Sequence, residues 1–595
     1  MNKKINFTQI IALLISLILL GNYANAADND IFRAMQDELN RSMQQLKLDN
    51  LKRPYYIEYV LKIAHNNEVK ASLGEITSIT DNVPSITLSV MIRVGDYKFD
   101  QKNFVDIGLN FYGSFDEEET YSNRRIPKEI DYPSLRRELW LATDAAYKEA
   151  TEIFSRKEAA LKNQIRTDTL WDYAQIVPTN TVDTISIPVF DMNAAKTLAM
   201  EVSAIFRDFP TIAESKANYY SKTATTYYLN TEGVQYVKNS NYTGFEVGAF
   251  AQASDGMPLT NYYITVGSLP SDLPTKDSIK NAVVAVAGAL NNSLHATVLD
   301  DSYSGPILIT GEAACNLFAQ AFLPAVTTQR DRTLADNVGV SFGGDKSKAF
   351  QKKIGGRVLP TFLSIKDAPT LATYNGIKLF GHYKIDDEGV VPQDVDIVKD
   401  GYLTTLLSDR TPIKRVTESN GHSRSFAPTP SNIIITANKK SQATYADLKK
   451  QMLQLCKKRD LPYGIIVKRI QTEKISSMLS SFNLSYDYSD RNVVKITPVE
   501  VYKVFPDGKE ELIRGGQITG ITPAAFKDII KVGNKNNALT ILQPYIMNIN
   551  REAWGGVELV TIIGQDLLFE DAEFQVVDKN YKKPPYIANP LSEKK

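Results

Sequence analysis

The sequence is poor in the side chains that bind transition metals or form disulfides. Its 595 residues include four histidines and two cysteines: His65, His295, His382, His422, Cys315 and Cys456. One disulfide is possible but a disulfide framework is excluded, so stability must come from hydrophobic cores. Both cysteines lie in apolar helical patterns, and we expect them to be buried as small hydrophobic side chains rather than exposed as reactive thiols.

Net charge is absent as well, since 68 lysines and arginines balance 68 aspartates and glutamates. Residues 1–26 contain Lys3, Lys4 and no acid, so the chain without them has 66 basic and 68 acidic residues, a net charge of −2. Such a surface gives no electrostatic basis for binding nucleic acid. The sequence also has no phosphate-binding glycine loop, no G-x-S-x-G and no H-E-x-x-H. These signatures of nucleotide-binding proteins, hydrolases and zinc peptidases are therefore missing.

A long apolar run does occur near the N-terminus. Lys3 and Lys4 precede an apolar run of eleven residues at positions 10–20, in which Ser16 alone is polar, and Ala-Asn-Ala follows at 24–26. This order predicts a secretory signal cleaved after Ala26, and hence an exported protein, periplasmic or secreted, with no stable membrane span after signal removal. The alternative is an uncleaved membrane anchor, which would need about 20 apolar residues.

The length and the 43% content of hydrophobic residues predict about two to four domains. Apolar residues at helical spacing predict a helix over 30–48, a second helix capped by Ser134, a third after Asp191 and a fourth over 279–290. Aromatic and β-branched residues predict a strand over 55–64 and a hairpin over 225–238 that turns at Gly233. The 27–295 segment is therefore expected to be an α/β N-terminal and middle region.

From about residue 303 the pattern changes toward strands and tight turns. Asp400-Gly401 can adopt the positive φ angles of a two-residue hairpin turn, and residues 554–577 alternate as strands do. We place the domain boundary near residue 295 and expect a β-rich domain over 296–595. The predicted fold class is α+β.

Three segments carry a family resemblance. Residues 347–358 (SKAFQKKIGGRV), 374–410 (with IDDEG and KDG) and 420–436 (NGHSRSFAPTPSNIIIT) follow one another as in the C-terminal domain of the TldD/PmbA family, whose members are also called modulators of DNA gyrase. The likeness is weaker over the N-terminal half. It implies an α/β N-terminal region followed by a large, mostly antiparallel β C-terminal domain, usually paired with a second subunit.

The resemblance also implies where zinc would bind in catalytic relatives. TldD-like members carry H-E-x-x-x-H at the start of the helix that opens this domain, and a cysteine ligand further downstream. In this chain the matching positions are Gly311, Glu312 and Asn316, and no cysteine follows Cys456. Glycine offers no side-chain donor, and zinc seldom accepts a neutral amide oxygen. The comparison therefore implies a member without zinc or any other cofactor, a pseudoenzyme.

Glu312 is the one residue that matches the motif. It could be a retained general base, but we favour a vestigial acid at a helix start, ionised and held by backbone N–H groups. Cys315 as a replacement ligand or nucleophile is disfavoured, because no histidine is adjacent to it in sequence. Asp386, Asp387 and Glu388, with His382 and His422, could hold calcium or magnesium; we interpret the acids as an architectural turn.

Two functions remain open. The first is a zinc-less relative that binds an extended peptide or unfolded protein segment by strand addition, or serves as the non-catalytic partner of a peptidase, in a homodimer or a heterodimer with a related subunit. The alternative is a metallopeptidase involved in proteolysis, alone or within a heteromeric complex. Gyrase modulation conflicts with export and with the near-neutral charge.

Overall fold

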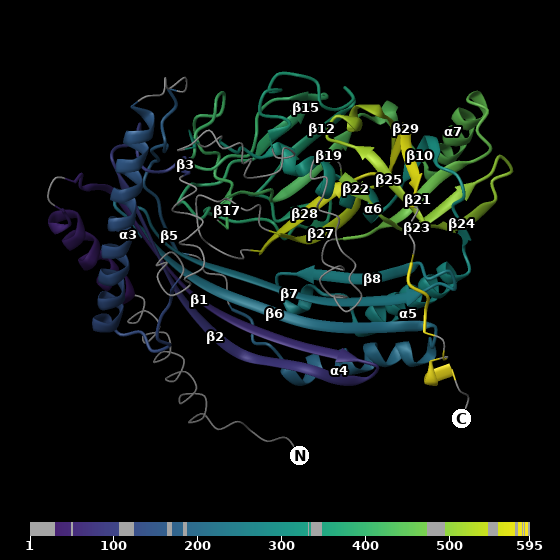
Figure 1. Ribbon diagram of the computed structural model, residues 1–595, viewed down its shortest axis with the longest axis horizontal. Coiled ribbons are helices and arrows are strands. Elements are labelled where there is room, and N and C mark those ends of the chain that lie inside the picture. Colours follow the sequence, from purple (N-terminus) through teal and green to yellow (C-terminus); the bar gives the residue numbers. More distant parts are fainter. Residues whose placement is uncertain are drawn as a thin grey trace, which may run out of the picture.

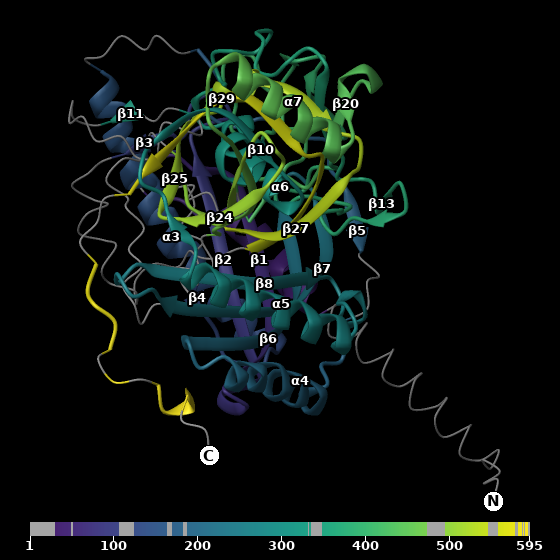
Figure 2. The ribbon, with the colours of Figure 1, turned by 90° about the vertical axis from the view of Figure 1, so that its right-hand side faces the viewer.

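Two β-rich halves lie one above the other in the computed structural model (Figure 1). The N-terminal half supplies a long, curved sheet, and the C-terminal half lies over one face of it, as the view turned by 90° also shows (Figure 2). The structure describes residues 30–48, 51–105, 124–162, 169–182, 187–330, 333–334, 348–425, 427–472, 494–544, 557–577, 581–585, 587 and 589–592. The predicted signal at residues 1–26 lies outside these ranges.

Within the described ranges the N-terminal sheet has seven strands, four of them unusually long. Their order is β4-β2-β1-β6-β7-β5, and β8 pairs with β7. The bounds are β1 (Pro54–Ser72), β2 (Glu75–Val94), β4 (Arg124–Arg125), β5 (Asn180–Val182), β6 (Ile212–Asn230), β7 (Gln235–Gln252) and β8 (Pro258–Gly267). The predicted strand at 55–64 is part of β1. The predicted hairpin at 225–238 is also confirmed, although its two arms continue well beyond that segment.

Four helices cover the face of this sheet that is turned away from the C-terminal half. They are the helix over residues 30–45, α3 (Tyr132–Leu161), α4 (Met192–Ala204) and α5 (Lys276–Leu294). Their apolar sides pack on β1, β2, β6 and β7 in two hydrophobic clusters. Asp191 caps α4 as predicted. The prediction for α3 was wrong: Asp131, not Ser134, is the N-cap, because the Asp131 carboxylate accepts the Ser134 N–H at 2.8 Å.

The C-terminal half is built from two main sheets, mostly antiparallel, which confirms the α+β class. The larger contains β9 (Thr297–Val298), β10 (Tyr303–Ile309), β20 (Gln442–Ala443), β21 (Gly464–Ile470), β22 (Val494–Ile496), β23 (Pro498–Val504), β24 (Glu510–Arg514), β25 (Gly516–Ile521), β26 (Ile529–Gly533) and β29 (Leu567–Val576). The smaller contains β12 (Leu363–Asp367), β15 (Val395–Lys399), β16 (Tyr402–Leu403), β19 (Asn432–Ala437), β27 (Asn537–Pro544) and β28 (Val557–Gly564). Helix α7 (Tyr445–Lys458) packs against the larger sheet.

Three short strand pairs complete the described structure. They are β3 (Phe104–Val105) with β11 (Thr333–Leu334), β13 (Thr373–Tyr374) with β14 (Ile377–Lys378), and β17 (Ser423–Arg424) with β18 (Ala427–Pro428). The hairpin between β15 and β16 turns at Asp400 (φ 48°) and Gly401 (φ 82°), as predicted. Within the described ranges, no helix is long and apolar enough to cross a membrane.

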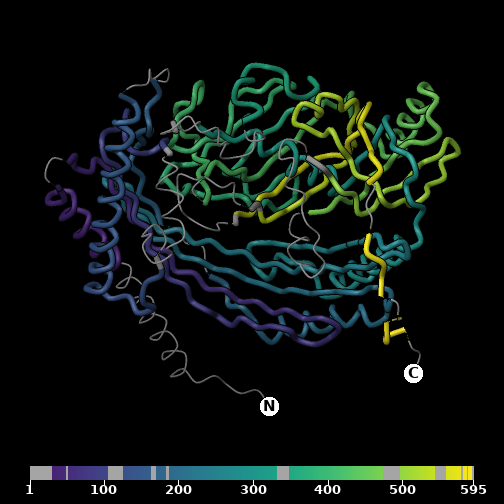
Figure 3. Tube along the Cα trace, in the orientation of Figure 1, coloured from purple at the N-terminus to yellow at the C-terminus, as the bar shows by residue number. Residues whose placement is uncertain are grey.

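The chain changes from one set of sheets to the other after α5. Among the described strands, those of the N-terminal sheet all end by Gly267, and those of both C-terminal sheets all begin at Thr297 or later. The path of the chain returns at its end (Figure 3). There the carbonyl of Lys582 accepts a hydrogen bond of 2.6 Å from the Gln252 side chain, so the tail contacts the N-terminal half.

Candidate functional site

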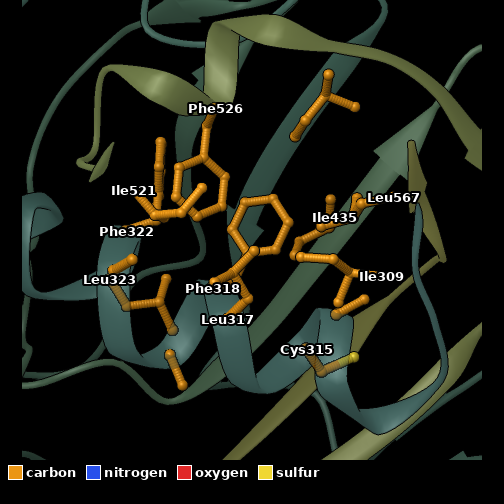
Figure 4. Close-up of a cluster of buried hydrophobic side chains, with 14 of the residues drawn as sticks. Ile309, Cys315, Leu317, Phe318, Phe322, Leu323, Ile435, Ile521, Phe526 and Leu567 are labelled. Carbon is orange, nitrogen blue, oxygen red and sulfur yellow. The ribbon is translucent and has the colours of Figure 1, made fainter. Parts of the chain in front are cut away.

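The segment with the degenerate motif is α6 (Glu312–Leu317), which follows the buried strand β10. It continues into a π-helical turn (Phe318–Phe322) and a 3₁₀ turn (Leu323–Val326). Its apolar side lies in the main core of the C-terminal half, where Phe318 and Phe322 pack on Phe526 (Figure 4). Four apolar side chains at helical spacing form this side and are buried: Leu317, Phe318, Ala321 and Phe322. Packing alone therefore fixes this segment.

Gly311, at the first histidine position of the motif, is the N-cap of α6. Its backbone has φ 60° and ψ −137°, a conformation that strains any residue with a side chain. Its N–H donates to the Asp566 carboxylate at 2.8 Å. The position is therefore used for a backbone turn and offers no metal donor.

Asn316, at the second histidine position, is 7% exposed. Its side-chain oxygen accepts a hydrogen bond of 3.0 Å from Gln320, which also donates to the carbonyl of Gln471 at 2.8 Å. The residues that stand at the family's histidine positions thus do not fit zinc, which needs nitrogen, sulfur or carboxylate donors. Among the residues that the structure describes, no group of three His, Cys, Asp or Glu side chains could hold a metal ion.

Glu312 is exposed at the start of α6. Although solvent reaches it, the surrounding protein desolvates the carboxyl and raises its pKa, and the positive charge of Arg469 opposes that shift. We expected backbone N–H groups to hold the ionised form; this was wrong, because no hydrogen bond to its carboxylate exists within the described ranges and the pKa moves the other way.

The N-terminal half contributes a strand to the surroundings of Glu312. Tyr262 and Tyr263 of β8 are close enough that the Glu312 charge raises the pKa of both phenols, after burial as the main cause. The Tyr262 hydroxyl donates to the carbonyl of Ile470 at 2.6 Å, and Arg469 donates to the carbonyl of Tyr262 at 2.6 Å. In both ribbon views β8 lies below α6, on the side of the C-terminal half that faces the long sheet (Figures 1 and 2).

β8 is an edge strand in the described part of the chain, because it pairs with β7 alone. The carbonyl of Tyr262 points away from β7, toward Arg469. By strand alternation, the backbone groups of Ile264 point the same way. No motif in the sequence marks Tyr262, Tyr263 or Arg469, so none of them was predicted as a site residue. The aromatic and β-branched run around 262–266 could have predicted a strand, but not its position beside α6.

Both cysteines are buried, as predicted. The Cys315 thiol donates weakly to the carbonyl of Asn537 at 3.7 Å, and burial raises its pKa to about 12. The Cys456 sulfur lies 3.9 Å from the Tyr303 hydroxyl, and burial raises its pKa as well. Thiols with raised pKa values are poor nucleophiles and poor zinc ligands at neutral pH.

The acidic turn is held together by its own hydrogen bonds. The fully buried Asp386 carboxylate accepts the N–H groups of Glu388 and Val390 at 2.9 and 2.8 Å, and that of Ser423 at 3.1 Å. Burial and the neighbouring Glu388 charge raise the pKa of Asp386. Asp387 pairs with Lys238 of β7 at 2.7 Å. Each carboxylate thus has an internal partner, since Glu388 accepts the N–H of Arg410 at 2.8 Å.

The two histidines of this region do not complete a ligand group with the acids. His382 is exposed, and its Nδ1 lies 3.0 Å from the carbonyl of Leu379. His422 is buried between Asn420 and Asp367, with its Nε2 3.7 Å from an Asp367 oxygen, and burial lowers its pKa.

Comparison with known proteins places this arrangement among described folds. Residues 302–550 match the PmbA/TldA metallopeptidase C-terminal domain. A protein from Thermotoga maritima described as a candidate modulator of a DNA gyrase is 13% identical, with a TM-score of 0.56 over 91% of this chain and 100% of its own. TldE from Thermococcus kodakarensis is 11% identical, with a TM-score of 0.54 over 91% and 100%. A similarly described protein from Bacteroides thetaiotaomicron is 12% identical, with a TM-score of 0.53 over 91% and 99%. No curated protein matches the chain.

Proposed function

Because the chain belongs to the TldD/PmbA family, we propose that it is an exported, zinc-less member that binds extended peptides or unfolded protein segments, or serves as the non-catalytic partner of a peptidase. It would act as a homodimer or as a heterodimer with a related subunit.

The proposal rests on the residues that occupy the two histidine positions of the family motif. Gly311 stands in a conformation that disfavours any side chain, and the Asn316 amide is hydrogen-bonded to Gln320. Neither position can donate nitrogen or sulfur to a metal. Glu312 alone would leave a general base with no metal-bound water to deprotonate. These facts support a role in binding over a role in hydrolysis.

Strand addition at β8 is the binding mode that we propose. An edge strand offers main-chain donors and acceptors, and such bonds recognise an extended peptide largely independently of its sequence. The outward side of β8 faces the C-terminal half, where Tyr262, which already donates to the carbonyl of Ile470, would supply an aromatic contact. A peptide at this edge would pass near Glu312, whose charge acts on Tyr262.

The decisive experiment compares three forms of the purified chain without residues 1–26 by calorimetric titration with an N-acetylated, C-amidated Ser/Thr/Val peptide. Ile264→Pro removes the outward N–H of Ile264 and is expected to abolish binding. The ladder to β7 should survive, because edge strands tolerate proline on the solvent side. Ile264→Val keeps the donor, loses one methylene and should bind as the unmodified chain does.

Two results would contradict the proposal. Equal binding by Ile264→Pro and Ile264→Val, with unchanged circular dichroism, would exclude strand addition at β8. Near-stoichiometric zinc, removable by a chelator together with peptide cleavage, would establish the metallopeptidase alternative. N-terminal sequencing of the protein from its native cells tests export; it should begin at Ala27, and retention of Met1 on a cytoplasmic protein would refute it.

A further inference from the structure

Two lysines lie on the face of the long sheet that is turned toward the C-terminal half. Lys62 belongs to β1 and Lys222 to β6. Side chains alternate between the faces of a strand, so Lys62 shares its face with Val60, and Lys222 shares its face with Tyr228. Val60 and Tyr228 both pack on Ile385 of the C-terminal half, which identifies the face.

The acids near these lysines already have other partners. Asp387 forms an ion pair of 2.7 Å with Lys238 and accepts the N–H of Ser425. Glu558 pairs with Arg424 at 3.3 Å and accepts the Ser425 hydroxyl at 2.8 Å. Each of these two carboxylates thus has its own cation.

Lys62 and Lys222 are left over from this pairing. Neither ammonium forms an ion pair or hydrogen bond with any residue that the structure describes, so each of the two positive charges lacks a partner in direct contact. Burial lowers the pKa of Lys222, the charge of Lys62 lowers it further, and Glu558 only partly offsets these effects. Two half-buried cations that repel each other are costly unless an anion joins them.

The sheet surface between the lysines carries only small side chains. The strand register places Ser85, Ala64, Ala224 and Ser240 side by side in one row across β2, β1, β6 and β7. Lys62 lies one row to one side, and Lys222 one row to the other. Along the strands, the positions of Lys62 and Lys222 are four residues apart, which is about 13 Å. Two lysine side chains that extend toward each other can span this distance.

We propose that Lys62 and Lys222 bind a carboxylate of the peptide held between the two halves of the molecule, either a free C-terminus or an acidic side chain. This inference rests on the proposed function. Lys222 of β6 pairs with Tyr242 of β7. The next residue of β7, Thr243, pairs with Gly267 at the end of β8. A peptide that leaves the end of β8 needs to cross only two strands, about 10 Å, to reach Lys222.

Three peptides of one Ser/Thr/Val sequence test the proposal by calorimetric titration at low ionic strength. All are N-acetylated; one ends in a free acid, one in an amide, and one in an amide with a single internal glutamate. We expect at least one carboxylate form to bind about five-fold more tightly than the plain amide, and salt to reduce that preference. Preference for the free acid or for the glutamate form identifies the source of the carboxylate.

The variant Lys62→Gln/Lys222→Gln should lose this preference while still binding the plain amide as the unmodified chain does. Its thermal midpoint should not fall, because neither lysine has an acidic partner to leave unpaired. Lys216→Gln is the matched control: Lys216 lies on β6 and already pairs with Glu214 at 2.7 Å, so the preference should persist.

The outcomes separate the two proposals. If the plain amide binds as well as both carboxylate forms, or if the double variant keeps the preference, the carboxylate site is refuted and peptide binding stands. If none of the three peptides binds, both proposals are refuted. If Lys216→Gln loses the preference equally, the effect reflects overall charge, and the assignment to Lys62 and Lys222 is refuted.

Discussion

Arg410 provides a direct test of how the two halves are joined. It comes from the C-terminal half, is 0% exposed, and forms two hydrogen bonds of 2.7 Å to the two carboxylate oxygens of Glu232. Its Nε and Nη2 also donate to the carbonyl of Ala174 at 2.9 and 2.7 Å. The guanidinium lies 3.9 Å from the ring centre of Tyr173. One side chain thus contacts two separate segments of the N-terminal half.

Replacing Arg410 with alanine would leave these partners without their cation. Glu232 would keep the Tyr97 hydroxyl, which donates at 2.8 Å, but would lose its neutralising charge. Removing one partner of a buried ion pair costs about 3–5 kcal/mol. Arg410→Lys keeps the charge but not the planar fork, so we expect a smaller loss of about 1.5–3 kcal/mol, the scale of hydrogen bonds to charged groups.

A double-mutant cycle in urea measures this interaction. Arg410→Ala, Glu232→Gln and the combined variant are unfolded while the fluorescence of the neighbouring Trp171 is followed. The double variant should lose less free energy of unfolding than the sum of the single losses, because each single change already removes the pair; couplings of about 0.5–3 kcal/mol are usual for contacting residues. Additive losses, or an Arg410→Ala loss below about 1 kcal/mol, would refute the reasoning.

Three further predictions concern the candidate site. Because the folded-state pKa of Glu312 is raised, its ionised form destabilises the fold above that pKa, and the penalty disappears as pH falls through it. Glu312→Gln should therefore leave the free energy of unfolding at pH 7 unchanged or raise it by less than about 1 kcal/mol at this exposed position, with no gain in acid. Peptide affinity should not change, whereas cleavage by a peptidase would slow about 10²- to 10⁴-fold. Cys315 and Cys456 should react with a thiol reagent at pH 8 only after unfolding, and rapid labelling of the folded chain would contradict their assigned burial. Asp386→Asn should lower the free energy of unfolding by about 1–3 kcal/mol, because the new amide nitrogen would face the Ser423 N–H. The melting temperature of the unmodified chain should not respond to calcium or EDTA, and a calcium-dependent rise would establish a metal site.

The elements that could be predicted from the sequence are those fixed by local physics. Asp191 caps α4 because its side chain reaches the N–H three residues on, and Asp400-Gly401 turns a hairpin because both residues adopt positive φ. The apolar face of α6 follows from its spacing alone. The wrong cap at Ser134 is also a local matter, because the Asp131 carboxylate, three residues earlier, is the acceptor that caps α3.

The contacts that define the candidate site are not local. Tyr262 bonds to Ile470 across 208 residues, and Arg410 bonds to Glu232 across 178. No periodicity or motif in one sequence encodes such pairings, since many polar residues are equally available to meet. The raised pKa of Glu312 has the same origin: it depends on β8 and Arg469, which only the tertiary structure brings near.

Restoring the motif histidines should not restore zinc binding, and the geometry of α6 gives the reasons. Histidine at 311 would have to adopt φ 60° and ψ −137°, at a cost of about 1–3 kcal/mol. Histidine at 316 would replace a buried amide that accepts a hydrogen bond from Gln320. A catalytic zinc site needs three protein ligands, and no cysteine follows Cys456 to supply the third.

The double variant Gly311→His/Asn316→His should therefore bind zinc no more tightly than the unmodified chain in a competition titration with a chromogenic chelator. Asn316→His alone is the control, because it adds a donor without straining the backbone at position 311. Stoichiometric zinc in the double variant, bound at about 10⁻⁹ M or tighter, would show that the turn adapts and that only the two histidines separate this chain from a metal site.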